Sequence, residues 1–201
     1  MNKKSRPLDK QEYETFITTL MHGFEHNGVI TYSNPRITAI CIIQANTGLR
    51  IGDVLSLKLK NIVYEGGRYH FDIIEEKTKK KRTFTIAPEV VNFLQAYALE
   101  NNIRPDWLLF PITQRAVSKH LKKTAEYLGY QNISSHSFRK FFATTIYNDN
   151  NFNLELVRTL LQHASQATSA KYIQVSPSVV ETALRNHVYI PDFKKMEKTA
   201  I

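Results

Sequence analysis

Residues 34–50 read NPRITAICIIQANTGLR, and this stretch predicts the helix around which the rest of the chain folds. Asn34 is a favourable helix cap, Pro35 suits the first helical position, and Gly48 is a typical helix stop. Between them the run AICIIQA is apolar on nearly every side, which is typical of a helix buried all round. We therefore expect a central helix ending at Gly48, followed at once by Arg50 on a turn.

Helical signals continue outward from this stretch. Asp9 and Glu12 form a capping-box pattern, and apolar residues then recur at helical spacing at Tyr13, Phe16, Ile17 and Leu20. A short helix is expected within RIGDVLSLKL. Further helices are predicted over residues 88–101, 113–128, 135–148, 154–162 and 177–187. The last of these has one apolar side (Val179, Val180, Ala183, Leu184), which suits either its own core or a neighbouring subunit.

The middle of the chain has the alternation of strands rather than helices. RYHFDIIEE and KRTFTIA are rich in β-formers, and the polar KTKKK between them predicts a hairpin loop. An earlier strand is expected near KNIVYE, closed by Gly66 and Gly67. Glu75 and Glu76 are adjacent on a predicted strand, so they should face opposite ways. The predicted fold class is mainly α with a small antiparallel β-sheet inserted (α+β), with one domain over 1–188 and a loosely ordered tail over 189–201.

The net charge indicates which partners the protein binds, and the cysteine content indicates the compartment in which it works. The 201 residues include 27 Lys and Arg against 18 Asp and Glu, a net charge of +9. Such a balance favours a polyanionic partner, most often nucleic acid, although a merely soluble basic protein is the alternative. The single cysteine, Cys41, lies in an apolar run and is expected to be a buried thiol in a reducing compartment. No run approaches the length of a membrane span, so we expect a protein that is neither exported nor membrane-spanning.

Several kinds of catalysis lack their residues. The sequence contains a single cysteine and no acidic cluster suited to a metal. It also lacks a glycine-rich phosphate loop and the elbow of a serine hydrolase. We therefore expect a protein that works without a metal or a nucleotide cofactor.

Cations, imidazoles and one phenol remain at breaks between predicted elements. These candidate catalytic residues are Arg50, Lys77, His136, Arg139, His163 and Tyr172. Arginines bind phosphate oxygens bidentately, histidine and lysine move protons, and a phenolate can form a covalent bond. Each also has an ordinary interpretation. Arg50 would complement a helix dipole, Lys77 would belong to a solvated charge run, and Tyr172 would fill space among ten tyrosines.

Taken together, four segments resemble the catalytic domain of the tyrosine recombinases, the phage-integrase family. TGLRIGDVLSLKLKNI is similar to the first box of that family, which makes Arg50 the first catalytic arginine and Asp53 its supporting acid. EEKTKKKRTFTI resembles the hairpin that presents the catalytic lysine, Lys77. HSFRKFFATTIY matches the His-x-x-Arg box at His136 and Arg139. LLQHASQATSAKYIQV matches the last box, with His163 and the nucleophile Tyr172.

The resemblance implies a mechanism and partners. Tyr172 would attack a DNA phosphate and form a 3′-phosphotyrosine without a cofactor, with strands then exchanged during integration, excision or inversion. The implied partners are double-stranded DNA, further copies in a synaptic tetramer and accessory DNA-bending proteins, in the bacterial cytoplasm at the nucleoid. We expect DNA contacts from exposed basic side chains on the hairpin and two helices: Lys79, Lys80, Lys81, Arg82, Lys119, Lys122, Lys123 and Lys140.

Three departures from the family pattern stand out. Gln162 takes the place where the family usually has glycine, and Lys140 the place where histidine is frequent. Only about six residues precede the first helix, where most members carry a further DNA-clamping domain. Two other functions stay open at this point. A type IB topoisomerase uses nearly the same residues to nick and reseal one duplex, and a non-catalytic member would bind DNA or regulate a recombinase.

Overall fold

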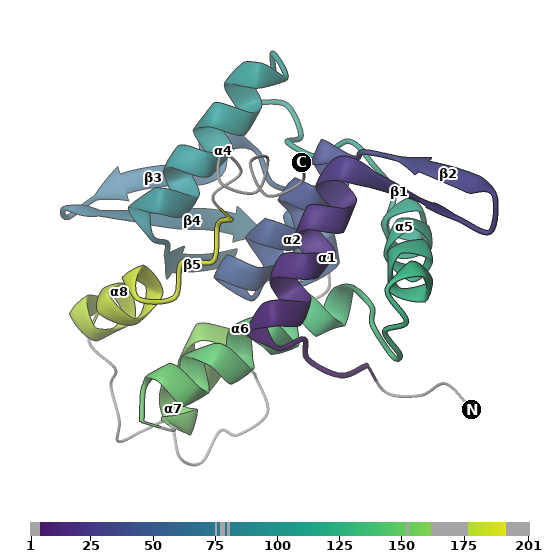
Figure 1. The fold of residues 1–201 in the computed structure, drawn as a ribbon. Helices are drawn as coiled ribbons and strands as arrows, with labels where there is room; N and C mark the ends of the chain where they lie inside the picture. The colour runs from purple at the N-terminus through teal and green to yellow at the C-terminus, as the bar shows by residue number, and fades with distance from the viewer. Residues whose placement is uncertain are drawn as a thin grey trace.

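The computed structural model describes residues 5–74, 76, 79, 81–151, 153–161 and 177–191, without the side chains of Arg82 and residues 177–179. The helices in this part are α1 (Lys10–His22), α2 (Pro35–Thr47), α3 (Ile51–Leu55), α4 (Pro88–Glu100), α5 (Gln114–Tyr127), α6 (Ser135–Asp149), α7 (Leu154–Leu161) and α8 (Pro177–Arg185), with a 3₁₀ turn at Leu59–Asn61. The strands are β1 (Gly23–His26), β2 (Val29–Tyr32), β3 (Ile62–Glu65), β4 (Arg68–Ile74) and β5 (Lys81–Thr85). Figure 1 shows helices grouped around α2, with the β3–β4–β5 sheet on one side.

Helix α2 is the centre of the core, as its sequence predicts. The Asn34 side chain accepts a hydrogen bond from the Ile37 N–H at 3.1 Å, and Gly48 ends the helix with φ of 64°, in the left-handed region. Every residue from Ile37 to Thr47 is buried. Cys41 is among them, and burial raises the pKa of its thiol well above the ordinary value. The expectation of a buried thiol is therefore confirmed.

Helices α1 and α6 pack on α2 from one side. The capping box of α1 forms as predicted: Asp9 accepts from the Glu12 N–H at 2.7 Å, and Glu12 accepts from the Asp9 N–H at 3.1 Å. The Tyr13 ring stacks on Phe141 of α6 at a centroid distance of 4.6 Å. Aromatic packing therefore joins the two helices that flank α2.

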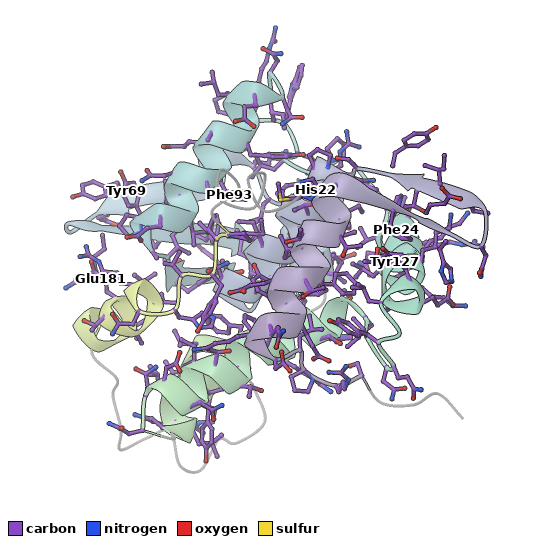
Figure 2. The ribbon with its side chains drawn as sticks, viewed as in Figure 1. His22, Phe24, Tyr69, Phe93, Tyr127 and Glu181 are labelled. Carbon is purple, nitrogen blue, oxygen red and sulfur yellow. The ribbon has the colours of Figure 1, made fainter. Side chains whose placement is uncertain are left out.

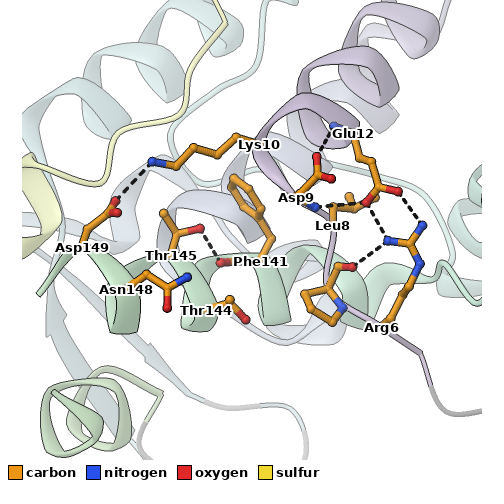
Figure 3. Close-up of a pocket in the computed structure, with 11 residues that line it drawn as sticks. Arg6, Leu8, Asp9, Lys10, Glu12, Phe141, Thr144, Thr145, Asn148 and Asp149 are labelled. Atoms are coloured by element: carbon orange, nitrogen blue, oxygen red, sulfur yellow. Dashed lines mark hydrogen bonds and ion pairs between the residues drawn. The ribbon is translucent and has the colours of Figure 1, made fainter. Parts of the chain in front are cut away.

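A groove of about 480 Å³ lies between the N-terminal segment and the exposed side of α6 (Figure 3). The Arg6 guanidinium makes two hydrogen bonds of 2.6 Å to the Glu12 carboxylate. Lys10 Nζ lies 3.6 Å from Asp149 Oδ2, which connects α1 to the end of α6. The Arg6–Glu12 pair therefore holds the N-terminal segment on α1, and the Lys10–Asp149 pair joins α1 to α6.

The expected three-stranded sheet is present. Strands β3, β4 and β5 are antiparallel in that order, and Phe71 pairs with Phe84 across β4 and β5. Phe71 and Ile73 turn toward the core, which follows the alternation of the sequence. The loop between β4 and β5 corresponds to the predicted KTKKK hairpin. Residue 76 lies in a turn beyond the end of β4, so the prediction that Glu76 is on the strand is wrong.

A second hairpin, β1–β2, was not predicted. Its turn residues Asn27 and Gly28 have φ of 52° and 71°, the two left-handed residues of a tight hairpin turn. Phe24 stacks on Tyr127 of α5 at 4.4 Å, which fixes the hairpin against that helix (Figure 2). Most of its side chains are exposed, so its sequence lacks the buried side that identifies a strand. The fold class of helices with small antiparallel sheets is nevertheless confirmed.

The described end of the chain packs against the domain. Residues 189–191 were expected in a loosely ordered tail, but Tyr189 packs on Phe141 and its N–H donates to the Asn46 side chain. Residues 192–201 lie outside the described residues. On α8, Ala183 and Leu184 are buried and Val180 packs on the core, so this helix covers its own domain. None of the described helices is long and apolar enough to cross a membrane.

Candidate active site

Arg139 is buried where α2, α6 and α7 meet. Its guanidinium donates to the carbonyl oxygen of Gly48, the residue that ends α2, and to that of Leu161, the last residue of α7, at 3.2 Å. The residue is only 7% exposed. A buried charge needs such acceptors to offset its lost hydration, and two carbonyls on different helices also fix the plane of the guanidinium.

The absence of a side chain at Gly48 lets Phe142 and Leu161 pack closely against the end of α2. A Cβ atom on Gly48 would lie 2.6 Å from Phe142 Cδ1 and 2.8 Å from Leu161 Cδ2. The left-handed turn at Gly48 also redirects the chain, so that Arg50, two residues later, precedes α3 as its N-cap residue with extended backbone angles. The two predicted arginines therefore belong to one junction, since Arg139 bonds the glycine whose turn places Arg50.

Asp53 connects Arg50 to the hairpin that contains Lys77. Its Oδ1 accepts the Glu76 N–H at 2.9 Å, and its Oδ2 lies 4.0 Å from Arg50 Nη1. The carboxylate is 1% exposed, and among the described residues Oδ2 has no hydrogen-bond partner. This buried acid can thus hold the backbone of residue 76 and face a guanidinium that is partly open to solvent. The supporting role of Asp53 stays a prediction.

Glu76 and Gln114, which the sequence analysis did not propose as site residues, extend the contact between Asp53 and the hairpin. The Glu76 carboxylate accepts a hydrogen bond from Gln114 Nε2, at the start of α5, at 3.2 Å. It also lies directly against Gly52, because a Cβ there would overlap Glu76 Oε2. Lys77 itself lies outside the described residues. The residue before it is held by α3 and α5, a long-range arrangement for which the sequence contains no local signal.

The predicted histidines and tyrosine are described only in part. His136 is exposed in the first turn of α6, one turn before Arg139, and the Ser134 N–H donates to the Ser137 hydroxyl at 3.1 Å as part of the helix cap. His163 and Tyr172 lie outside the described residues. The described residues on either side of 162–176 are Leu161, whose carbonyl bonds Arg139, and Pro177, which begins α8.

The predicted DNA-contact residues are spread over the hairpin and two helices. Lys119, Lys122 and Lys123 are exposed on α5, where Lys122 also pairs with Glu126 at 3.6 Å. Lys79 and Lys81 are exposed, and Lys81 lies 3.1 Å from Asp72. Lys80 and the Arg82 side chain lie outside the described part of the chain.

Lys140 differs from the other basic residues. Its ammonium donates to the backbone carbonyl of Ser5, which ties α6 to the N-terminal segment. It is partly buried, so much of its side chain is engaged within the domain. Lys140 is therefore less available to DNA than the lysines of α5.

The described residues do not assemble a metal site. No group of three His, Cys, Asp or Glu side chains suited to a metal ion occurs among them.

Comparison with known proteins identifies the family. The model of the phage integrase family matches residues 6–178, so the chain belongs to that family. The chain is 27% identical over 159 residues to the probable integrase/recombinase YoeC of Bacillus subtilis, covering 76% of this chain and 84% of YoeC. It is 26% identical to tyrosine recombinase XerH of Helicobacter pylori, covering 90% of this chain and 52% of XerH.

Solved structures agree on the fold. The XerH site-specific recombinase bound to difH substrate in a pre-cleavage complex superposes with a TM-score of 0.60 at 23% identity, covering 99% of this chain and 53% of that one. The integrase from mycobacterium phage Brujita gives a TM-score of 0.62 at 16% identity, covering all of this chain and 65% of that one. The chain therefore spans about half the length of XerH. The family resemblance and the fold class expected from sequence are both confirmed, whereas the roles of single residues stay predictions.

Proposed function

We propose that the chain is a tyrosine-type site-specific DNA recombinase, which cleaves and rejoins DNA strands through a 3′-phosphotyrosine. The observation that carries the proposal is the junction at Gly48. Arg139 bonds its carbonyl, Arg50 follows its turn, and Asp53 connects Arg50 to the residue before Lys77. These contacts connect residues of three separate boxes around the turn at Gly48, which supports a common phosphate site for Arg50 and Arg139. Membership of the phage integrase family supports the same function.

In the proposed reaction, the Tyr172 oxygen attacks the scissile phosphorus. The bond from phosphorus to the 5′ oxygen breaks, and Lys77 donates the proton that this oxygen takes up. His136 assists removal of the phenolic proton, because it is exposed one turn from Arg139. Arg50 and Arg139 stabilise charge on the non-bridging oxygens, which is usually the largest contribution to such catalysis. His163 donates a hydrogen bond to the same phosphate. The phosphotyrosine conserves the bond energy, so the 5′-hydroxyl of another strand can reverse the reaction.

The proposed partner is double-stranded DNA, bound by the exposed lysines of α5 and of the β4–β5 hairpin. The complex of XerH with its difH substrate supports this choice through the shared fold. Exchange of two strands needs more than one active site, so we infer a synaptic tetramer on DNA, aided by DNA-bending proteins. The substrate would then be chromosomal or mobile-element DNA in the bacterial cytoplasm.

The function is tested with duplexes that carry the repeats flanking the chain's own gene. A nick just 3′ of the scissile phosphate lets a short 5′-hydroxyl fragment diffuse away, so each cleavage event leaves a trapped covalent adduct. We expect an adduct with the unmodified chain, none with Tyr172→Phe, and exchange products from two intact sites. Relaxed plasmid without exchange products would instead indicate a nicking-closing enzyme. No adduct with the unmodified chain would contradict the proposal and favour a DNA-binding regulator.

A further inference from the structure

The chain beyond α8 enters the core of the domain. His187 is 1% exposed, and its Nε2 lies 2.9 Å from the carbonyl oxygen of Ala45 in the last turn of α2. Its ring packs edge-on against Phe142 at 4.8 Å and lies 5.0 Å from the Tyr189 ring. Since a carbonyl can only accept, the imidazole must carry its proton on Nε2. His187 thereby satisfies a carbonyl at the end of α2.

Asn46 holds the backbone two residues further on. Its Oδ1 accepts the Tyr189 N–H at 2.6 Å, and its Nδ2 donates to the Tyr189 carbonyl at 3.3 Å. The same carbonyl accepts the Tyr13 hydroxyl at 2.6 Å. A buried amide side chain therefore acts as the pairing partner of an otherwise isolated stretch of backbone.

This anchor, formed by Asn46, His187 and the Tyr189 backbone, packs against α2 and α6, the helices that also carry Gly48 at their end and Arg139. Asn46 is two residues before Gly48, whose carbonyl binds Arg139. Phe142, which contacts His187, also packs against Gly48, where an added Cβ would lie 2.6 Å from its Cδ1. The end of the described chain and the candidate phosphate site are consequently fixed to one rigid part of the core.

The anchor is connected to Tyr172 through α8. Five peptide steps separate Tyr172 from Pro177, and a fully extended chain spans at most about 3.6 Å per residue, or about 18 Å. Helix α8 is itself held, since Ala183 and Leu184 are buried and Glu181 binds Arg68 on β4 at 2.8 Å. Figure 2 shows Glu181 on α8 facing the sheet that contains Tyr69. Fixing the far end of α8 therefore also fixes Pro177, which is five residues from Tyr172 in the sequence.

We propose that Asn46 and His187 are positioning residues, which hold α8 so that Tyr172 meets the phosphate bound by Arg50 and Arg139. This inference rests on the proposed function and adds residues to it. The region matched by the family model ends at residue 178, before His187 and Tyr189. Neither Asn46 nor His187 is exposed, so neither touches DNA, and their effect must pass through the backbone.

The expected effect is on the chemical step rather than on binding. Loss of the Nε2–H donor leaves the Ala45 carbonyl unsatisfied and frees the end of α8 to open locally. A nucleophile misplaced by about 1 Å can cost on the order of a hundredfold in rate. We expect His187→Leu, which is of similar volume, to lower single-turnover cleavage at saturating DNA by at least about tenfold, with the Kd for DNA changed less than about twofold.

Rescue distinguishes positioning from general destabilisation. In His187→Gln the amide nitrogen can take the place of Nε2 and donate to Ala45, so cleavage should recover most of the lost rate. His26→Leu makes the same chemical change at an exposed residue of β1 and should cleave like the unmodified chain. All rates are measured well below the Tm of each variant. If His187→Leu does not fold, Asn46→Ser removes the contacts to Tyr189 from the other side, with the same expected result.

A second substrate distinguishes a defect in the attack by Tyr172 from a defect in proton donation by Lys77. A duplex with sulfur in place of the scissile 5′ oxygen has a leaving group that needs no proton. This substrate should restore cleavage by Lys77→Ala but not by His187→Leu, because the latter is defective in the attack itself. Cleavage of either substrate by His187→Leu at the unmodified rate, with only a lower Tm, would overturn the inference. An unmodified chain that forms no adduct would instead contradict the proposed function, so the two failures can be told apart.

Discussion

Acidification should destabilise the domain through His187, and the size of the effect follows from its surroundings. Burial lowers the pKa of His187 from the ordinary 6.5 to about 4, because a charged imidazole would lose its hydration. The hydrogen bond to the Ala45 carbonyl and the nearby Asp149 act in the opposite direction, and Lys10 adds to the lowering. His187 Nδ1 has no partner among the described residues, so a second proton there would be unsatisfied.

The sign of the pH dependence follows from which state binds the proton. Between about pH 4 and 6.5 the unfolded chain protonates this histidine and the folded chain does not. The free energy of unfolding therefore rises with pH across this window. The part of it that depends on neutral His187 is lost as the pH falls from about 6.5 to about 4. At about 1.4 kcal/mol for each pKa unit, the loss attributable to His187 is about 3 kcal/mol.

The assay compares the unmodified chain with His187→Gln, which does not titrate. Urea unfolding followed by circular dichroism at a series of pH values between 7 and 4 gives the free energy of unfolding of each protein. The carboxylates titrate alike in both, so the difference between the two curves isolates His187. We expect that difference to change by about 3 kcal/mol in favour of the variant toward pH 4. Parallel curves, or a measured pKa near 6.5 for His187, would refute the reasoning.

Three further predictions concern the candidate site and its DNA. Gly52→Ala should displace Glu76, whose Oε2 would overlap the new Cβ, and lower single-turnover cleavage at least about tenfold; no loss in this variant would exclude the packing of Glu76 on Gly52 as a support of the hairpin. Arg139→Lys keeps the charge but cannot bond both the Gly48 and Leu161 carbonyls and a phosphate, so cleavage should fall at least about a hundredfold, and near-normal cleavage would count against a bidentate phosphate contact. The loop between β4 and β5, together with α5, is expected to engage about six phosphates. In a salt titration the logarithm of DNA affinity should then fall with the logarithm of salt at a slope of about −5. Salt-insensitive binding would require a further DNA-reading element.

The elements that sequence predicted well carry their signals locally. The Asp9–Glu12 box, the Asn34 cap with Pro35 and the Gly48 stop each act within one helical turn, and each forms as expected. The β1–β2 hairpin was missed although Asn27–Gly28 is a strong turn signal, because its exposed strands lack an apolar side. At that position turn chemistry is therefore a better guide than periodicity.

The candidate site was predictable only in part. Arg50, Asp53 and Arg139 were proposed from their boxes, and the structure places them around the turn at Gly48, while their roles stay predictions. The contacts of Glu76 with Gln114, and of His187 with Ala45, join residues 38 and 142 positions apart. No local periodicity encodes such pairs, and their polar side chains resemble any surface residue until the fold places them. For the same reason Lys140, a predicted DNA contact, is found bonded to Ser5.

The most direct test of the proposed function is to find which residue carries the DNA. The trapped adduct is digested with nuclease and trypsin, and the peptide that retains a nucleotide is identified by its mass. We predict the nucleotide on YIQVSPSVVETALR, residues 172–185, or on its missed-cleavage form that begins at residue 159. A nucleotide on residues 141–158, which contain Tyr147, or on residues 186–194, which contain Tyr189, would contradict Tyr172 as the nucleophile.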